Sequence, residues 1–393
     1  MHEFDALDVE KLRRRRDAKW SIYPAPVLPA WVAEMDYPLA EPIRRELERA
    51  AADSEVGYPT ALPWTGLVEC FAERMADRFG WQPEPQRVEV LSEVVQGIFG
   101  ALYAYSKPGE GIVVQTPIYP PFLQSVAATG RRLVDNRLTP RSSGHGIDFD
   151  ALRAAADAGT RVLLLCNPHN PTGRVFSAGE LGELAEIAVE RDWIVVADEI
   201  HGDLVYPGRR HVPFATLSPE IAERTVTLTS ATKAFNIPGL RCAIAHFGSE
   251  DLQQRFDAAA PPHVRGGVGL LGIYATIAAW RDSQPWLDSV LAYLDGNRRF
   301  LTEFVDAQLP GVKTWLPEAT YLAWLDCSAL RAPRSASHFF LKRAEVALQD
   351  GDHFGQGFAD HARLNFATSR PILQKILERM ATAVQAEVSG DPD

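Results

Sequence analysis

Cysteine is scarce in this sequence, whose 393 residues include only Cys70, Cys166, Cys242 and Cys327. These four are widely spaced, and each lies in a stretch typical of a buried strand or helix rather than of a disulfide framework. No run of about 18 apolar residues occurs, so a membrane-spanning helix is not expected. The first residues also lack the apolar core of a secretory signal. We therefore expect a protein of the reducing cytoplasm with no membrane partner.

An excess of positive charge is also missing. The chain has 40 Lys and Arg against 51 Asp and Glu, a formal net charge of −11. This balance disfavours nonspecific attraction to nucleic acid, so a small-molecule partner is expected. The basic run 13–16 is interpreted as a solvated helix face or a subunit contact. A metal site is not expected, because Cys166 and His169 are followed by no second pair of ligands.

Short apolar runs do occur, and they alternate with helical periodicity from about residue 90 to residue 250. The alternation is typical of a parallel sheet with crossover helices, which predicts an α/β fold. Ser177 and Glu180 form a capping box for one of the crossover helices. A long helix at 286–309 is expected to lead into a smaller α+β unit. The expected strands are 111–116, 161–166, 193–198, 225–229 and 242–247.

Three loops that follow expected strands carry unusual polar residues. They are "NPHNPTGR" at 167–174, "DEIHGD" at 198–203 and "SATKAFNIPGLR" at 230–241. Open parallel sheets build their ligand sites at the carboxyl ends of the strands. One site can therefore collect all three loops.

The third loop places Lys233 near several groups that suit an anion. A lysine that is buried beside another cation has a lowered pKa and a free lone pair, so it can form a Schiff base. The hydroxyls of Ser230 and Thr232 and the guanidinium of Arg241 suit a phosphate dianion. The alternative, taken for Lys233 alone, is a solvent-facing lysine with an incidental arginine nearby.

The other two loops supply a carboxylate and an amide. Asp198 ends an apolar strand, so its carboxylate needs a cation, and a pyridinium nitrogen meets that need. The alternative for Asp198 is a capping residue at the junction of strand and loop. In "NPHNPTG", two Asn-Pro steps and a glycine predict a rigid turn that presents Asn170 as a directional donor.

Taken together, these motifs resemble the fold-type I pyridoxal-phosphate enzymes of the class I/II aminotransferase superfamily. More narrowly, they resemble its carbon–sulfur lyase branch, the cystathionine β-lyases of aminotransferase type. The resemblance covers nearly the whole chain, and further matching stretches are "LPAWVAEMDY" at 28–37, "TPIYPPF" at 116–122, "ATYLAWLD" at 319–326 and "ARLNFATSR" at 362–370. It implies a mostly parallel central sheet flanked by helices, with a smaller α+β domain. The implied division is an N-terminal segment (1–45) that packs with the small domain, a large cofactor-binding domain (46–287) and a small C-terminal domain (288–393).

The resemblance assigns the residues around the ring of pyridoxal 5'-phosphate. It makes Lys233 the Schiff-base lysine and the base that removes the Cα proton, and Asp198 the partner of the pyridinium nitrogen. Asn170 donates to the phenolic oxygen, and Tyr119 stacks on the ring. Arg363 binds the α-carboxylate of an amino-acid substrate; taken alone, a surface ion pair is its alternative.

The resemblance also assigns the phosphate contacts. Ser230 and Arg241 hold the phosphate, with the backbone amides of Val94 and Val95 at an expected helix start. Tyr58 matches a tyrosine that reaches the phosphate of the neighbouring subunit, which implies a homodimer.

Two positions depart from the common pattern of the superfamily. Glu93 stands where a glycine or small residue is usual, so the expectation is either a carboxylate near the phosphate or a loop that turns differently. His201 replaces a tyrosine of ordinary aminotransferases and follows the lyase pattern.

The resemblance predicts a pyridoxal-phosphate-dependent β-lyase acting on cystathionine or cysteine S-conjugates. α,β-Elimination would pass through an aminoacrylate and give pyruvate, ammonia and a thiol. The same catalytic residues also suit an aminotransferase, or decarboxylation or oxidative deamination of a cysteine S-conjugate in a biosynthetic pathway. A regulatory protein that retains the cofactor-binding fold is the non-enzymatic alternative.

Overall fold

The computed structural model describes residues 3–60, 64–142, 144–330, 332 and 334–389. Its main feature is a seven-stranded sheet of order β2-β10-β9-β8-β7-β3-β4. The five strands from β9 to β4 are parallel to one another, while β10 is antiparallel to both β9 and β2. The predicted α/β fold with a mostly parallel sheet is therefore confirmed. The strands are β2 (Val88–Leu91), β3 (Gly111–Val114), β4 (Arg132–Asp135), β7 (Thr160–Cys166), β8 (Ile194–Asp198), β9 (Thr225–Thr229) and β10 (Ala243–Phe247).

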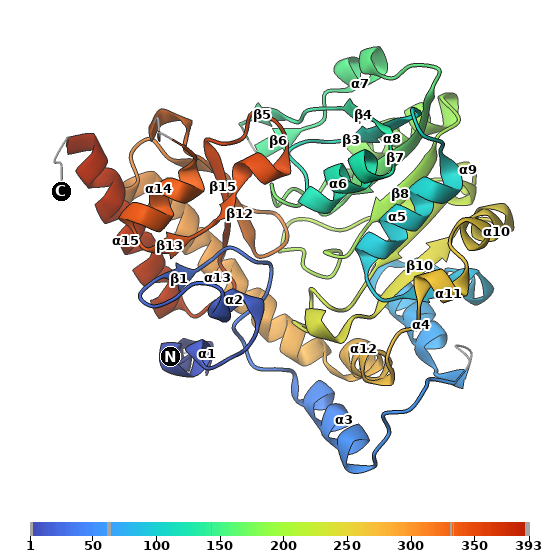
Figure 1. Ribbon diagram of the computed structural model, residues 1–393, viewed down its shortest axis with the longest axis horizontal. Helices are drawn as coiled ribbons and strands as arrows, with labels where there is room; N and C mark the ends of the chain where they lie inside the picture. The colour runs from blue at the N-terminus through green and yellow to red at the C-terminus, as the bar shows by residue number, and fades with distance from the viewer. Residues whose placement is uncertain (1–2, 61–63, 143, 331, 333, 390–393) are drawn as a thin grey trace.

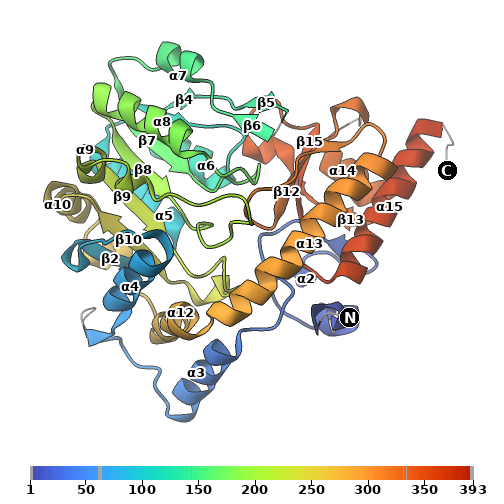
Figure 2. The same cartoon turned by 180° about the vertical axis from the view of Figure 1, so that it is seen from behind.

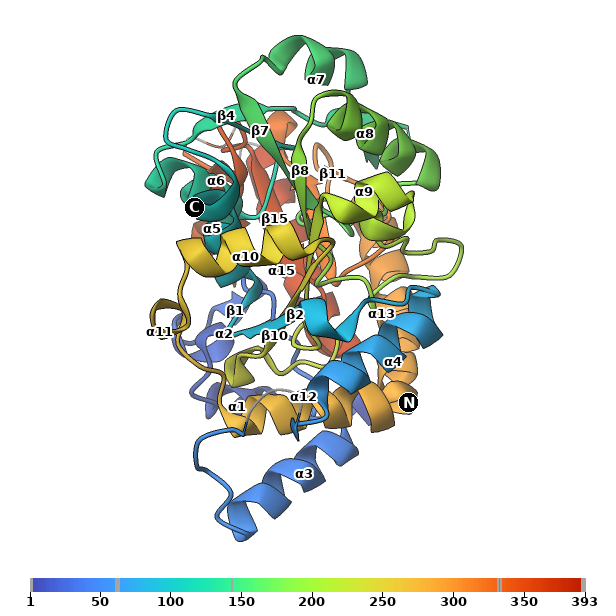
Figure 3. The ribbon, with the colours of Figure 1, turned by 90° about the vertical axis from the view of Figure 1, so that its right-hand side faces the viewer.

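Helices cover both faces of this sheet because alternate strand residues point to opposite sides. One apolar cluster contains Val113, Leu163 and Val195, whereas the cluster on the other face contains Ile112 and Val162. The edge view of Figure 3 shows the two helical layers on either side of β8. One layer contains α5 (Val94–Tyr105), α6 (Pro120–Ala128) and α10 (Glu250–Ala259), and the other contains α7 (Phe149–Ala155), α8 (Ala178–Glu190) and α9 (Pro219–Glu223).

The predicted capping box at the start of α8 is present. The Ser177 side chain accepts from the backbone N–H of Glu180, and the Glu180 carboxylate accepts from the backbone N–H of Ser177. Beyond the sheet lie α4 (Leu67–Phe79), α11 (Pro262–Arg265) and α12 (Leu270–Asp282).

The chain then leaves the large sheet along α13 (Gln284–Gln308), which runs into a second unit (Figure 2). This unit has an antiparallel sheet of order β11-β12-β15-β14. Its elements are β11 (Lys313–Thr314), β12 (Leu322–Asp326), α14 (Ala336–Arg343), β13 (Val346–Ala347), β14 (Gln349–Asp350), β15 (His361–Asn365) and α15 (Arg370–Ser389).

The N-terminal segment lies against this second unit (Figure 1). It contains α1 (Val9–Arg13), α2 (Ala18–Ser21) and β1 (Leu28–Pro29), and β1 pairs in parallel with β13. The following helix, α3 (Glu41–Ala52), packs on α12. A small hairpin of β5 (Thr139–Arg141) and β6 (Gly144–Gly146) completes the strands of the described ranges. Within those ranges, no helix has the length and apolar character needed to cross a bilayer.

Candidate active site

A cavity of about 270 Å³ lies where β7, β8 and β9 end. Strand pairing aligns Cys166 with Asp198, so adjacent strands deliver their loops to the same edge of the sheet. The cavity gathers nine of the residues that were expected to form the site. They are Val94, Val95, Tyr119, Asn170, Asp198, His201, Ser230, Lys233 and Arg241.

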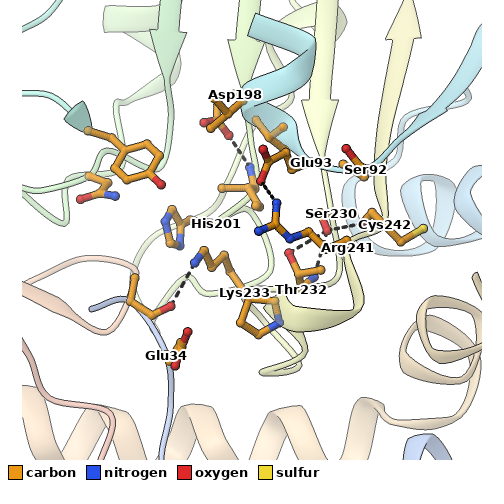
Figure 4. A pocket seen from close by; sticks show the side chains of 18 of the residues that line it. Glu34, Ser92, Glu93, Asp198, His201, Ser230, Thr232, Lys233, Arg241 and Cys242 are labelled. Carbon is orange, nitrogen blue, oxygen red and sulfur yellow. Dashed lines mark hydrogen bonds and ion pairs between the residues drawn. The ribbon is translucent and has the colours of Figure 1, made fainter. Parts of the chain in front are cut away.

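Lys233 reaches into the cavity from the loop after β9. Its Nζ donates a hydrogen bond to the backbone carbonyl of Ala33 at 3.0 Å, as Figure 4 shows. Burial, and next the charge of Arg363, lower the pKa of Lys233 to about 8. A larger fraction of the amine is therefore neutral and nucleophilic near neutral pH than for an ordinary lysine.

Asp198 is the last residue of β8 and is 5% exposed. Its Oδ1 accepts a hydrogen bond from the backbone N–H of Ile200 at 3.1 Å. Burial raises the pKa of Asp198 to about 7, although that hydrogen bond acts in the opposite direction. A cationic N–H placed against this carboxylate would offset its desolvation and keep it ionised.

Arg363 does not line the cavity but lies behind Asn170. Its Nη1 donates to Asn170 Oδ1 at 2.9 Å, and its Nη2 donates to the carbonyl of Trp31 at 3.0 Å. The guanidinium also lies over the ring of Phe354, 5.0 Å from the centroid. Because Asn170 accepts through its oxygen, its amide nitrogen remains available as a donor.

The charge of Arg363 is unusual for so buried a position. Burial lowers the pKa of Arg363 to about 10, and its Nε makes no hydrogen bond to the described residues. A buried guanidinium with an unpartnered N–H group is suited to a carboxylate ligand. Tyr119, at the start of α6, donates its backbone N–H to the carbonyl of Asn170 at 3.1 Å, which ties the two loops together.

The opposite end of the cavity combines groups that bind anions. Helix α5 begins at Val94, so the amides of its first turn have no partner within the helix. The Ser230 hydroxyl donates to the carbonyl of Cys242 at 2.6 Å and lies 2.8 Å from Thr232 Oγ1. Arg241 closes this end with a backbone φ of 51°, which is the left-handed region.

His201 is buried above Lys233 (Figure 4). Burial, followed by the charges of Lys233 and Arg363, lowers the pKa of His201 to about 3. Its Nδ1 finds no hydrogen-bond partner among the described residues. The imidazole is therefore neutral and can hydrogen-bond a ligand in the cavity.

A family model for aminotransferase class I and II matches residues 32–380. The chain belongs to this family. It is 35% identical to the cystathionine β-lyase of Corynebacterium glutamicum, with 96% of this chain and 99% of that protein covered. It is 34% identical to the cystathionine β-lyase PatB of Bacillus subtilis strain 168, with 91% and 92% covered. Among solved structures, the PLP-bound C-S lyase from Staphylococcus hominis superimposes with a TM-score of 0.89 at 29% identity, covering 98% of this chain and 99% of that one.

Tyr58 is, after Arg363, a second expected site residue that does not line the cavity of this aminotransferase-family chain. It follows α3 and is 100% exposed. The cavity lining defined by the described residues does not include it.

Several residues that line the cavity were not predicted from the sequence. Ala33 and Glu34 form a wall that comes from the N-terminal segment, and Cys166 lies beside Asp198. Ala33 acts through its backbone carbonyl, which leaves no signal in residue type. Asn236 lies just behind this wall, and its side chain donates to the carbonyl of Met35 at 3.0 Å. The matching stretch at 28–37 was the available signal, although it does not say which atoms face Lys233.

Proposed function

We propose that this protein is a pyridoxal-phosphate-dependent carbon–sulfur lyase that acts on cystathionine or on cysteine S-conjugates. The observation that carries the proposal is the arrangement of Lys233, Asp198 and an anion-binding end around one cavity. Relatives at 34% and 35% identity that are named cystathionine β-lyases support the reaction type. We expect the products to be pyruvate, ammonia and a thiol.

The residues of the cavity fit the three parts of pyridoxal phosphate. The amine of Lys233 suits the aldehyde, and the buried carboxylate of Asp198 suits a protonated pyridine nitrogen. The amides of Val94 and Val95, the Ser230 hydroxyl and Arg241 suit the phosphate. Tyr119 would pack against the cofactor ring. Asn170 and His201, whose Nδ1 has no partner among the described residues, also line the cavity and would contact the polar edge of the ring.

When bound, this cofactor supplies an electron sink for the electron pair left on the substrate Cα. Arg363 would orient the substrate by its α-carboxylate, since its position is fixed by Asn170 and Trp31. Lys233 would then take the Cα proton as general base. Asp198 would keep the pyridine nitrogen protonated in a site shielded from water.

The Cβ–S bond breaks as the electrons from the Cα–H bond form a Cα–Cβ double bond. The sulfur leaves as a thiolate and takes up a proton. The remaining enamine reacts with water to give pyruvate and ammonia, so no external oxidant or reductant is required.

An aminotransferase is the second candidate, because the whole family carries that name and the same side chains serve both reactions. The test is to incubate the purified protein with cystathionine and with an S-alkyl cysteine, in the absence of any keto acid. Release of pyruvate and thiol in equal amounts supports the lyase. A keto acid that forms only after an acceptor keto acid is added would support the aminotransferase instead. Release of carbon dioxide would indicate decarboxylation, and no reaction with any amino acid would favour a regulatory protein.

A homodimer is part of the proposal, with Tyr58 reaching the phosphate site of the partner. Three large apolar side chains, Val56, Tyr58 and Trp64, are 68%, 100% and 80% exposed within nine residues of sequence. Such exposure is typical of an interaction surface. Light scattering would give the mass of a dimer, and Tyr58→Phe should weaken cofactor binding without altering that mass.

We also propose a cytoplasmic location and the three-part division 1–45, 46–287 and 288–393. The four cysteines are all buried and unpaired, which suits a reducing compartment. The pairing of β1 with β13 supports the packing of the N-terminal segment with the last unit. Limited proteolysis would test the boundaries, which fall within α3 and α13.

A further inference from the structure

Glu93 occupies an unusual position at the anion-binding end of the cavity. It is the N-cap residue of α5, yet its side chain makes no capping hydrogen bond to that helix. Instead, its Oε2 accepts from Arg241 Nη1 at 2.5 Å (Figure 4). Glu93 and Arg241 are 148 residues apart in sequence, so the ion pair exists only because the fold brings α5 beside the loop after β9.

This ion pair changes the charge that a phosphate would meet. Lys233 and Arg241 are the lysine and arginine among the described residues that line the cavity. Lys233 is used by the aldehyde in the proposed function, so Arg241 is the guanidinium left for the phosphate. Glu93 already neutralises that charge and places a carboxylate at the same helix start.

We propose that Glu93 limits the affinity of this site for the phosphate group of the cofactor, through its ion pair with Arg241. This inference rests on the proposed function, because it assumes that the anion-binding end receives a phosphate ester. A carboxylate and a phosphate repel each other, and a guanidinium shared between them binds each less strongly than it would bind one alone. Retention of the cofactor then depends more on Lys233 and Asp198 than on the phosphate.

The alternative role for Glu93 is to orient Arg241 toward the phosphate. Arg241 uses only Nη1 for Glu93, so Nη2 and Nε could face a phosphate while Glu93 held the side chain in place. In that case removal of the Glu93 charge would weaken phosphate binding. The two roles therefore predict effects of opposite sign. The exposure of the pair favours the first role, in which Glu93 weakens phosphate binding. The side chains of Arg241 and Glu93 are 60% and 46% exposed, so a contact between them holds Arg241 in place only weakly.

The experiment is a titration of the full-length chain, freed of cofactor, with pyridoxal phosphate and separately with pyridoxal. Pyridoxal has the aldehyde and ring but no phosphate, so the comparison isolates the phosphate contribution. The variant is Glu93→Gln, which keeps the shape and removes the charge. The matched control is Glu89→Gln on the neighbouring strand β2, where Glu89 faces Arg265 at 3.8 Å and Asp257 already pairs with that arginine at 2.8 Å.

We expect Glu93→Gln to lower the Kd for pyridoxal phosphate by about twofold to fivefold, the size of a charge effect between exposed, partly screened groups. The Kd for pyridoxal should not change, and Glu89→Gln should change neither. The gain should shrink at high salt, because both partners are exposed. A weaker or unchanged affinity for pyridoxal phosphate, or an equal gain for pyridoxal, would overturn the inference. Failure of the wild-type chain to bind pyridoxal phosphate would instead overturn the proposed function.

Discussion

Replacement of Arg363 by lysine tests how the proposed site recognises its substrate. The guanidinium is 3% exposed and is fixed by two hydrogen bonds, to Asn170 Oδ1 at 2.9 Å and to the Trp31 carbonyl at 3.0 Å. The planar fork leaves further N–H groups for a bidentate pair with the substrate carboxylate. A lysine keeps the positive charge but offers a single nitrogen, so it cannot reproduce that pair.

The expected magnitude follows from counting lost bonds. One charge-assisted hydrogen bond to the substrate is worth about 1.5–3 kcal/mol, which corresponds to a loss of about 10- to 150-fold in kcat/KM. The variant also leaves Asn170 Oδ1 or the Trp31 carbonyl without a donor. That second cost, about 1–3 kcal/mol, applies with and without substrate, so it should lower the free energy of unfolding rather than kcat/KM.

The assay is steady-state release of thiol from cystathionine, combined with urea unfolding of the same preparations. Arg137→Lys is the matched control, because Arg137 is an exposed arginine over an aromatic ring, with its guanidinium 4.1 Å from the centroid of Phe358. We expect the control to retain wild-type kcat/KM. If Arg363→Lys kept kcat/KM within threefold of wild type, the assignment of Arg363 to the substrate carboxylate would be wrong.

Further predictions concern the cofactor site and stability. Lys233→Ala should abolish thiol release and the visible absorption band of the bound cofactor while the circular dichroism spectrum is unchanged; residual turnover above 1% would contradict its role. Asp198→Asn should lower kcat by about 100-fold or more while cofactor content, measured after denaturation, falls little; a loss of cofactor alone would contradict the electronic role. Lys19→Met should lower the free energy of unfolding in urea by about 3–5 kcal/mol, because it leaves the buried Asp36 carboxylate without the cation that lies 3.0 Å from its Oδ2. A change below 1 kcal/mol would contradict this. Burial lowers the pKa of His169 to about 3, so as the pH drops below about 6.5 the unfolded chain binds a proton that the folded chain does not. The free energy of unfolding should therefore fall by up to about 1.4 kcal/mol per pH unit for this group. His169→Gln should flatten that slope.

The sequence predicted the parts of the fold that depend on local pattern. The strand expected at 225–229 is β9 residue for residue, and the other four expected strands shift at their ends by two residues or fewer. The direction of β10 was not predictable in the same way. A strand buried on both faces is apolar whether it runs parallel or antiparallel to its neighbour, so its composition carries no sign of direction.

The candidate site also contains contacts that strand order predicts and contacts that it does not. Asp198 ends, and Asn170 and Lys233 follow, parallel strands of one sheet. Parallel strands place their carboxyl ends together, so the meeting of these residues was predictable from strand order. The pairing of Glu93 with Arg241 was not, because it depends on which side-chain rotamers meet across 148 residues of sequence. The sequence marked Glu93 as a departure and gave no partner for it.

The position of Lys233 depends on contacts that no local pattern contains. Its amine is held by the carbonyl of Ala33, and the backbone around Ala33 is fixed from both units of the protein. Asn365 of β15 donates to the carbonyls of Val32 and Glu34, both at 2.6 Å, while Asn236 holds the next residues from the loop after β9. The N-terminal segment therefore acts as a backbone wall between the two sheets. Because this wall holds Lys233 through the backbone carbonyl of Ala33, the contact has no signature in residue type, yet its displacement would move the amine on which the proposed chemistry depends.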